Sequence, residues 1–334
     1  MRLDFSLLPV DDPQAMASAV DSLGPSDPLL CGWIPPIERD SGADRDNEAW
    51  AASLPRFQII GRSSNENASK VYLWDAWKRA YPQGYPGIRQ VTGSCVGAGG
   101  GNALFTLACC DVVVRRDPER VEVPNWLLPY GKSREFAGLR GRGEGSWGTT
   151  FARAVREVGH TPATLEGLPT FRSDNGLVWG REAELQWSDG ASIPEQWLTR
   201  ARPHLVRTTA RCDSTDDVRA AIINGYPLTC ASNWGGLMQC PVVHDRLLNR
   251  RRGTWMHQMS IIGWEDHSRL GEIFYVMNQW GQAAHGACPS GAPRGGFWVG
   301  RQDMADIVSQ REVFAFSEFQ GFPAAPPELD FSLL

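Results

Sequence analysis

Apolar residues recur with helical spacing between residues 71 and 165. "VYLWDAWKRAY" places Leu73, Trp74 and Trp77 on one face of a helix, and "NALFTLACCDVV" is apolar over most of its length. "GSWGTTFARAVREVG" has the apolar stripe of an amphipathic helix and ends at Gly159, as helices closed by a glycine do. We therefore predict that residues 71–165 are mostly helical.

The pattern changes between residues 166 and 317. "WMHQMSIIGWED", "EIFYVMNQWG" and "GGFWVGRQD" are short aromatic and β-branched runs separated by turn residues, which predicts antiparallel strands. "STDDVRAAIINGYPLTCAS" predicts a helix that is capped by Ser214 or Thr215, ends at Gly225 and leads into a strand. A helical half followed by a strand-rich half is typical of an α+β fold, so we expect one domain over residues 71–317.

Both ends of the chain lack this periodicity. Residues 1–70 are rich in Pro, Asp and Ser, which predicts an extended arm on the protein surface. Residues 318–334 form a tail, and "LDFSLL" occurs both at 3–8 and at 329–334. The two copies are either edge strands that dock on the same protein or a linear motif whose Phe and Leu side chains enter a partner's groove, which would serve binding or self-assembly.

Composition and charge exclude several classes of protein. A chain of 334 residues with 42% hydrophobic and 21% charged residues is globular, and its net charge of −5 disfavours a nucleic-acid surface. The N-terminus has no apolar stretch of signal-peptide length, and we expect no later segment to span a bilayer. The eight cysteines include no CxxC pair, which favours reduced thiols. We therefore expect a cytoplasmic protein, free or inside an assembled particle, with neither nucleic acid nor membrane as a partner.

The stretch "QVTGSCVGAGGG" could be either a glycine-rich phosphate-binding loop or the site of a nucleophilic cysteine. A P-loop needs a Lys followed by Ser or Thr, which is missing here. A dinucleotide fingerprint needs a preceding strand and a third glycine, whereas Asn102 occupies that position. "HGAC", which contains His285 and Cys288, lacks the second ligand pair of a zinc site. We therefore expect no cofactor and no metal.

Cys95 has the position of a nucleophile. A cysteine at the start of a helix lies at the positive end of the helix dipole, which favours the thiolate. A catalytic thiol also needs a base held by a third group. Of the six histidines, only His257 begins a strand-like apolar run, and the next predicted strand ends at Asn278. Neighbouring strands could bring the Asn278 amide oxygen beside the imidazole.

These motifs, in this order, resemble those of the papain-like cysteine peptidases, of the bacterial or phage type that is intracellular and not secreted. The family has a Gln ahead of "GSC", matched by Gln90 and Cys95, and a histidine followed six residues later by a glycine, matched by His257 and Gly263. Its "N-S-W-G" is similar to "NQWG", which starts at Asn278, and its "G-x-x-W-x-x-G/S" is similar to "GGFWVGRQDM". The resemblance covers about residues 70–305. It implies a helical half (about 71–165) packed against an antiparallel sheet or barrel half (about 166–317), with the active-site cleft between them.

The resemblance also implies a role for each matched residue. Cys95 would attack a carbonyl, His257 would act as base and then acid, and Asn278 would orient His257. Trp280 would shield that hydrogen bond from water, and Gln90 would form an oxyanion hole with the N–H of Cys95.

Several departures from the family pattern limit this assignment. Gln90 lies five residues before the cysteine, whereas secreted members typically have six. Val96 replaces the usual aromatic residue, and Gly93 and Ser94 stand where a disulfide-forming cysteine is common. The usual prodomain helix is not recognisable, which leaves open whether residues 1–70 cover the cleft.

The leading hypothesis is a cysteine peptidase that cleaves peptide or protein substrates through a thioester acyl-enzyme. The alternative is a structural or assembly protein of a phage virion or shell that keeps this fold and docks through "LDFSLL". Hydrolysis of a non-peptide amide or thioester is a third option. Trp234 and Trp298 are candidates for lining a substrate groove.

The glycines that follow Cys95 need an explanation of their own. Each glycine in a helix costs ~1 kcal/mol relative to alanine. We therefore expect another part of the chain to pack closely against Gly97, Gly99, Gly100 and Gly101, from either the strand-rich half or the N-terminal arm.

Overall fold

The computed structural model describes residues 31–39, 41–61, 67–117, 120–165, 171–173, 176–178, 181–289 and 291–325. Both copies of "LDFSLL" lie outside these residues, so their docking role stays a prediction.

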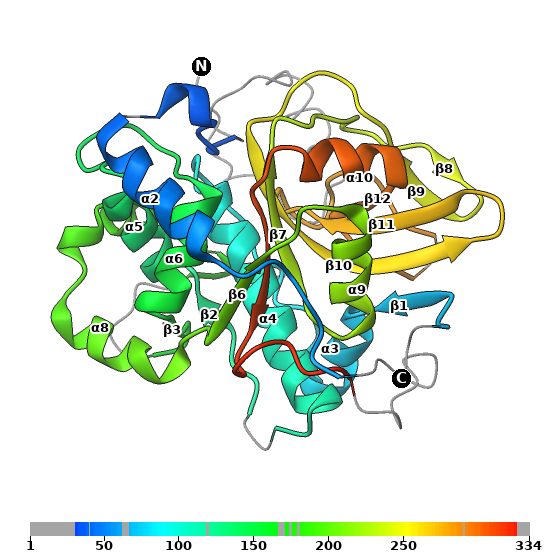
Figure 1. Ribbon diagram of the computed structural model, residues 1–334, viewed down its shortest axis with the longest axis horizontal. Helices are drawn as coiled ribbons and strands as arrows, with labels where there is room; N and C mark the ends of the chain where they lie inside the picture. Colours follow the sequence, from blue (N-terminus) through cyan, green and yellow to red (C-terminus); the bar gives the residue numbers. More distant parts are fainter. Residues whose placement is uncertain are drawn as a thin grey trace.

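Two lobes lie side by side, one mostly helical and one built on a sheet (Figure 1). The helical lobe contains α5, α6 and α8, whereas α9 and α10 cover the sheet, and α4 lies between the lobes. α7 packs against α5 in the helical lobe. The helices are α2 (Ser41–Ser53), α3 (Trp74–Ala80), α4 (Cys95–Val114), α5 (Leu127–Phe136), α6 (Gly148–Glu157), α7 (Arg181–Trp187), α8 (Glu195–Ala201), α9 (Thr215–Ile223) and α10 (Arg301–Val308).

The main sheet has nine strands in the order β6-β13-β7-β10-β11-β12-β9-β8, with β1 paired to β10. All its pairs are antiparallel except β12 with β9. Its strands are β1 (Lys70–Tyr72), β6 (Thr208–Arg211), β7 (Leu228–Ser232), β8 (Val242–Val243), β9 (Arg246–Asn249), β10 (His257–His267), β11 (Gly271–Met277), β12 (Gly296–Gly300) and β13 (Val313–Ser317). Two short hairpins pair β2 (Pro124–Asn125) with β3 (Thr161–Pro162) and β4 (Phe171–Ser173) with β5 (Gly176–Val178).

The predicted α+β fold is confirmed, and the barrel alternative for the strand-rich half is wrong. The strand order is open, because β6 and β8 lie at opposite ends and do not pair. The helix predicted before β7 is α9, and the Ser214 hydroxyl accepts from the N–H of Asp217 in a capping box. That helix is followed by Gly225 at φ 81°, a conformation that glycine adopts without strain.

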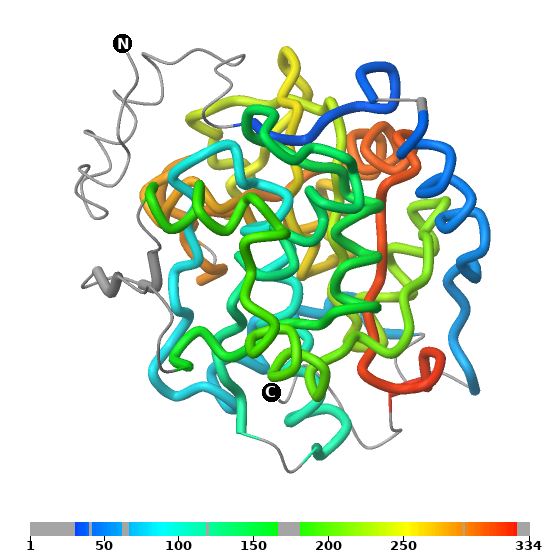
Figure 2. The backbone as a smooth tube through the Cα atoms, turned by 90° about the vertical axis from the view of Figure 1, so that its left-hand side faces the viewer, coloured from blue at the N-terminus to red at the C-terminus, as the bar shows by residue number. Residues whose placement is uncertain are grey.

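The structure corrects three other expectations. The helical half does not end at about residue 165, because α7 and α8, within residues 166–317, pack against α5 and β3 of that half. The arm is not extended throughout, because Ser41–Ser53 form α2, which packs against α6 and runs along the outer side of the molecule (Figure 2). "DRDNEAWAA" contains Glu, Arg and Ala, which favour helices, and no proline until Pro55. The helix predicted over "VYLWDAWKRAY" begins at Trp74, since Lys70–Tyr72 form β1 on β10.

α4 is the central helix of the molecule. Its 20 residues are nearly all buried between the sheet and the helical lobe. By length and composition it is apolar enough to cross a membrane, contrary to our expectation that no segment would be, yet 83% of that stretch is buried inside the protein. α4 is therefore accounted for as a core helix.

The glycines of α4 lie where neighbouring groups come very close. A Cβ atom on Gly99 would lie 2.8 Å from the carbonyl oxygen of Gln258 in β10, and one on Gly100 would lie 2.0 Å from the Phe151 ring. Gly97 and Gly101 meet the side chain of Trp126 at 2.7 and 2.9 Å. The expected close packing is confirmed, with backbone from the strand-rich half at Gly99 and aromatic rings from the helical lobe at the other three.

Replacing Gly99 or Gly100 by leucine is expected to lower the free energy of unfolding by about 3 kcal/mol, because overpacking displaces the β10 backbone or the Phe151 ring. Gly143→Leu is the control, since nothing lies within 4 Å of a Cβ there and its φ is not positive. Urea unfolding of the three variants provides the measurement. Equal stability of the Gly99 variant and the control would contradict close packing.

Candidate active site

Cys95 is the first residue of α4 and lies at the boundary of the two lobes. The carbonyl of Ser94 accepts from the N–H groups of Gly97 and Ala98 at 2.9 and 3.0 Å, so the first helical turn starts at the cysteine. The N–H groups of the first residues of a helix, here Cys95 and Val96, have no carbonyl partner within the helix, and such a helix start favours a nearby anion. The side chain of Cys95 is fully buried.

The loop before Cys95 is held by one buried carboxylate. Glu184 in α7 accepts from the N–H of Val91 at 3.0 Å and from the hydroxyls of Thr92 and Ser94 at 2.6 and 2.7 Å. These bonds satisfy a carboxylate that is 0% exposed. Burial nevertheless raises the pKa of Glu184 to about 7. Glu184 therefore fixes the path of the chain into the nucleophile.

His257 and Asn278 lie side by side at one end of two paired strands. β10 begins at His257, and Asn278 directly follows β11, whose Met277 pairs with Ser260. The predicted hydrogen bond is present, with 2.9 Å between His257 Nε2 and Asn278 Oδ1. The Trp280 ring lies 4.6 Å from the imidazole, centroid to centroid, so it covers this bond as the resemblance implied.

Gln279 joins the histidine strand to the cysteine helix. Its Nε2 donates to the carbonyls of Gln258 at 2.7 Å and Cys95 at 3.4 Å, and it lies 3.2 Å from His257 Nε2. The side chain of Gln258 reaches back to α4 and donates to the carbonyl of Val96 at 2.7 Å. Two neighbouring glutamines thus hold the two halves of the site together.

Gln90 lies at the start of the loop that leads to Cys95. Its N–H donates to the carbonyl of Gln279 at 3.1 Å, and its Nε2 donates to the carbonyl of Thr92 at 2.9 Å. An amide Nε2 carries two hydrogens, so one is left for a second acceptor. Its role in an oxyanion hole stays a prediction.

Residues 31–35, which we call the covering segment, lie over the cysteine. The N–H of Gly32 points at Cys95 Sγ at 3.2 Å. A Cβ on Gly32 would lie 1.7 Å from the Gly93 carbonyl oxygen, so only glycine fits here.

The covering segment bonds to both lobes through its backbone. On the sheet lobe, the N–H of Trp33 donates to the carbonyl of Met256 at 3.0 Å, one residue before His257. On the helical lobe, Ile34 N donates to Ser146 O at 3.0 Å, and Ser146 N donates to Gly32 O at 2.7 Å.

A buried carboxylate anchors the covering segment. Glu312 accepts from the indole N–H of Trp33 at 2.5 Å and from the Arg39 guanidinium at 2.7 Å. It also accepts from the N–H of Gly148 and the hydroxyl of Thr149 at 3.1 and 2.7 Å. The Trp33 side chain is 2% exposed, so it fills a pocket between the lobes.

The covered site is electrically neutral. Burial raises the pKa of the Cys95 thiol to about 11, although backbone N–H groups, including that of Gly32, oppose this. Burial lowers the pKa of His257 to about 3, against the bond to Asn278. Thiol and imidazole are therefore both uncharged near pH 7 while residues 31–35 are in place, and solvent must enter before an ion pair forms.

Solved structures share this arrangement of lobes. Xylellain, a cysteine protease from Xylella fastidiosa, matches with a TM-score of 0.53 and 16% identity over 87% of this chain and 97% of its own. Procathepsin B S9 from Trypanosoma congolense matches with a TM-score of 0.52 and 12% identity over 88% of each chain. The chain has the papain-like fold. No protein-family model matches it, and no curated protein matches it in sequence.

Within the papain-like fold, the two tryptophans expected at the groove lie in the core. Trp234 is fully buried and donates from Nε1 to Asp303, while its ring packs on Trp255. Trp298 is also fully buried, 5.2 Å from the Tyr275 ring. Both rings are buried with residues 31–35 in place, so a role for either at a substrate groove stays a prediction.

Sequence reasoning missed Glu184, Gln279 and His285. It left open whether residues 1–70 cover the cleft, and the structure shows that residues 31–35 of that arm lie over Cys95. The only local signal for Glu184 is a carboxylate beside two apolar residues, Ala183 and Trp187, on a short helix. Its bonds to residues 91–94 connect positions about 90 residues apart. Such pairs carry no periodicity, so spacing along the chain does not reveal them.

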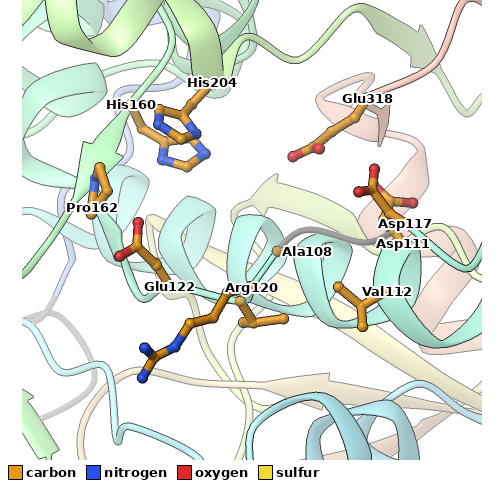
Figure 3. Close-up of a pocket in the computed structure, with 11 residues that line it drawn as sticks. Ala108, Asp111, Val112, Asp117, Arg120, Glu122, His160, Pro162, His204 and Glu318 are labelled. Carbon is orange, nitrogen blue, oxygen red and sulfur yellow. The ribbon is translucent and has the colours of Figure 1, made fainter.

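A cavity of about 50 Å³ lies beside the C-terminal half of α4, away from Cys95 (Figure 3). The stacked rings of His160 and His204 face it, as do Asp111, Glu122 and Glu318. None of the residues that hold Cys95 or His257 lines it. Among the residues that the structure describes, no three His, Cys, Asp or Glu side chains are grouped to hold a metal ion.

The Glu184 carboxyl is expected to make stability pH-dependent. Because its pKa rises from 4.5 to about 7 on folding, the folded chain binds more protons than the unfolded chain in that range, and stability falls as pH rises through it. Glu184→Gln removes this titration. From pH 5 to pH 8, the unfolding free energy of the wild type should therefore fall relative to that of Glu184→Gln by on the order of 2 kcal/mol. Parallel pH dependences in urea unfolding would contradict this account.

Proposed function

We propose that this chain is a cysteine peptidase in which Cys95 is the nucleophile, His257 the base and Asn278 its orienting group. The observation that carries the proposal is the covering segment itself. An extended stretch of peptide lies across Cys95 Sγ and bonds through its backbone to Ser146 on one lobe and Met256 on the other. A site that holds an extended peptide backbone over a thiol suits a peptide or protein substrate.

The chemistry follows from these positions once the covering segment has left. His257 takes the thiol proton, and the Cys95 thiolate attacks the amide carbon to form a tetrahedral oxyanion. The N–H of Cys95, with the second Gln90 hydrogen, would stabilise that oxygen. The C–N bond then breaks, His257 protonates the leaving amine, and a thioester remains. Water, deprotonated by His257, hydrolyses the thioester and restores the thiol.

The covering segment is bound as an occupant and not as a substrate. It presents the Gly32 N–H to Sγ, whereas attack needs a carbonyl carbon, and the Gly32 carbonyl is turned to Ser146 N at 2.7 Å. Turnover therefore requires displacement of residues 31–35.

The burial of Cys95 is also compatible with the alternative, an assembly protein whose site stays closed. Docking of that protein through "LDFSLL" remains a proposal. The third option, a non-peptide amide or thioester, uses the same three residues. All eight cysteines belong to the described part of the chain and none forms a disulfide. This supports the proposal of a reducing, cytoplasmic setting.

Gly32→Ala is expected to open the site, because its methyl group would collide with the Gly93 carbonyl and expel the covering segment. Loss of about 3 kcal/mol of binding corresponds to an increase of about 10²-fold in the rate at which a vinyl sulfone alkylates Cys95. Intact-mass spectrometry with peptide mapping measures this rate. Gly300→Ala is the control, since nothing lies within 4 Å of its Cβ.

Turnover separates the three functions. If the chain is a peptidase, Gly32→Ala should cleave a peptide library, and Gly32→Ala/Cys95→Ala should not. Cleavage of small non-peptide amides or thioesters without peptide cleavage would favour the third option. Alkylation of Cys95 in Gly32→Ala no faster than that of the other seven cysteines, with no cleavage, would favour the structural alternative.

A further inference from the structure

Asn278 makes a second side-chain bond that the Cys-His-Asn constellation does not include. Its Nδ2 lies 2.8 Å from Nε2 of His285, which is fully buried in the connection between β11 and β12. His257, Asn278 and His285 therefore form one hydrogen-bonded chain. The direction of each bond in this chain can be worked out from its neighbours.

The orientation of the Asn278 amide is fixed by the backbone. Gln279 N–H, which can only donate, lies 2.7 Å from the Asn278 atom that also faces His257. That atom must be the oxygen, because the amide nitrogen would place two donors together. The amide nitrogen therefore faces His285 and donates to it.

The protonation of His285 follows from this orientation. Its Nε2 accepts from Asn278, so its single proton is on Nδ1, which lies 3.3 Å from the Leu237 carbonyl. A backbone bridge pairs His285 with Gln239, and the His285 backbone has φ 67°, a left-handed conformation that is uncommon outside glycine. The surrounding structure thus maintains His285 in a mildly unfavourable backbone conformation.

The same logic sets the tautomer of the base. Asn278 Oδ1 accepts at 2.9 Å, so His257 carries its proton on Nε2 and leaves Nδ1 with a free lone pair. Nδ1 is buried and has no hydrogen-bond partner among the described residues. This is the nitrogen that would accept the thiol proton once the covering segment has left; in this structure it makes no hydrogen bond to Cys95 Sγ.

A competing donor makes this tautomer dependent on Asn278. Gln279 Nε2, fixed as a donor by its 2.7 Å bond to the Gln258 carbonyl, lies 3.2 Å from His257 Nε2. A donor there favours an unprotonated Nε2 and a protonated Nδ1, which could not act as a base. The Asn278 oxygen must therefore be held firmly against His257.

We propose that His285 is a positioning residue: it accepts from Asn278 Nδ2 and so keeps the Asn278 oxygen on His257, which holds His257 in the tautomer with a free Nδ1. Its catalytic consequence rests on the proposed function, whereas the tautomer itself does not.

The surroundings of His285 fit this role. Its ring lies 4.7 Å from Phe297, 5.6 Å from Trp280 and 5.9 Å from Trp255, centroid to centroid. This apolar enclosure strengthens the hydrogen bonds and keeps the ring uncharged, since burial lowers the pKa of His285 to about 4. A charged His285 would lose the lone pair that Asn278 needs.

The test uses protein labelled with ¹⁵N-histidine, in which two-bond proton–nitrogen spectra report the tautomer of each of the six rings. In the wild type, His285 should carry its proton on Nδ1 and His257 on Nε2. His285→Leu removes the acceptor and should shift His257 toward the Nδ1-protonated form. His285→Gln supplies a carbonyl oxygen in a similar place and should restore the wild-type tautomer of His257.

Kinetics provide the second readout, in the Gly32→Ala background. His285→Leu should lower kcat by up to about 10²-fold with KM unchanged, as expected for a misplaced base, and His285→Gln should recover most of it. Unchanged His257 tautomer and kcat in His285→Leu would overturn the proposal. So would a wild-type spectrum with the His285 proton on Nε2, which needs no variant to fold. If the tautomers are as predicted but the Gly32→Ala protein cleaves no peptide, the proposed function would be refuted and the positioning role of His285 would stand.

Discussion

The close approach of α4 to β10 is the constraint on which the site depends. Gly99 allows the helix backbone to reach the Gln258 carbonyl, and Gln258 in turn donates to the Val96 carbonyl at 2.7 Å. Since Cys95 starts α4 and His257 starts β10, this contact brings the ends of the two elements together. The glycines lower the intrinsic stability of the helix, and the close packing that they allow, which larger residues would prevent, offsets this cost.

The covering segment uses the same boundary between the lobes. It bonds to Met256, beside the histidine, and to Ser146, on the helical lobe, and its Trp33 side chain donates to Glu312. The thiol and imidazole are uncharged under this cover, because burial disfavours both charged forms. The covering segment therefore both occupies the cleft and keeps Cys95 and His257 uncharged.

The sequence predicted those parts of the site that depend on short motifs at the ends of helices and strands. A cysteine after "TGS" at the start of an apolar helix, and a histidine and an asparagine at the ends of two neighbouring strands, are visible in order along the chain. The Gly32–Cys95 and Trp33–Glu312 contacts are not, because they join a segment without periodicity to residues 63 and 279 positions away. α2 was missed because proline and aspartate around it outweighed its own alanines, and His285 because its partner lies in another motif.

Hydrogen–deuterium exchange of the covering segment tests the central claim most directly. The amides of Gly32, Trp33 and Ile34 donate to Cys95 Sγ, Met256 O and Ser146 O. These amides should exchange slowly in the untreated chain and fast in molecules whose Cys95 has been alkylated. The reason is that a reagent can reach Cys95 only after the covering segment has left it. Slow exchange that persists after alkylation would show that Cys95 reacts with the segment in place, and would contradict the account.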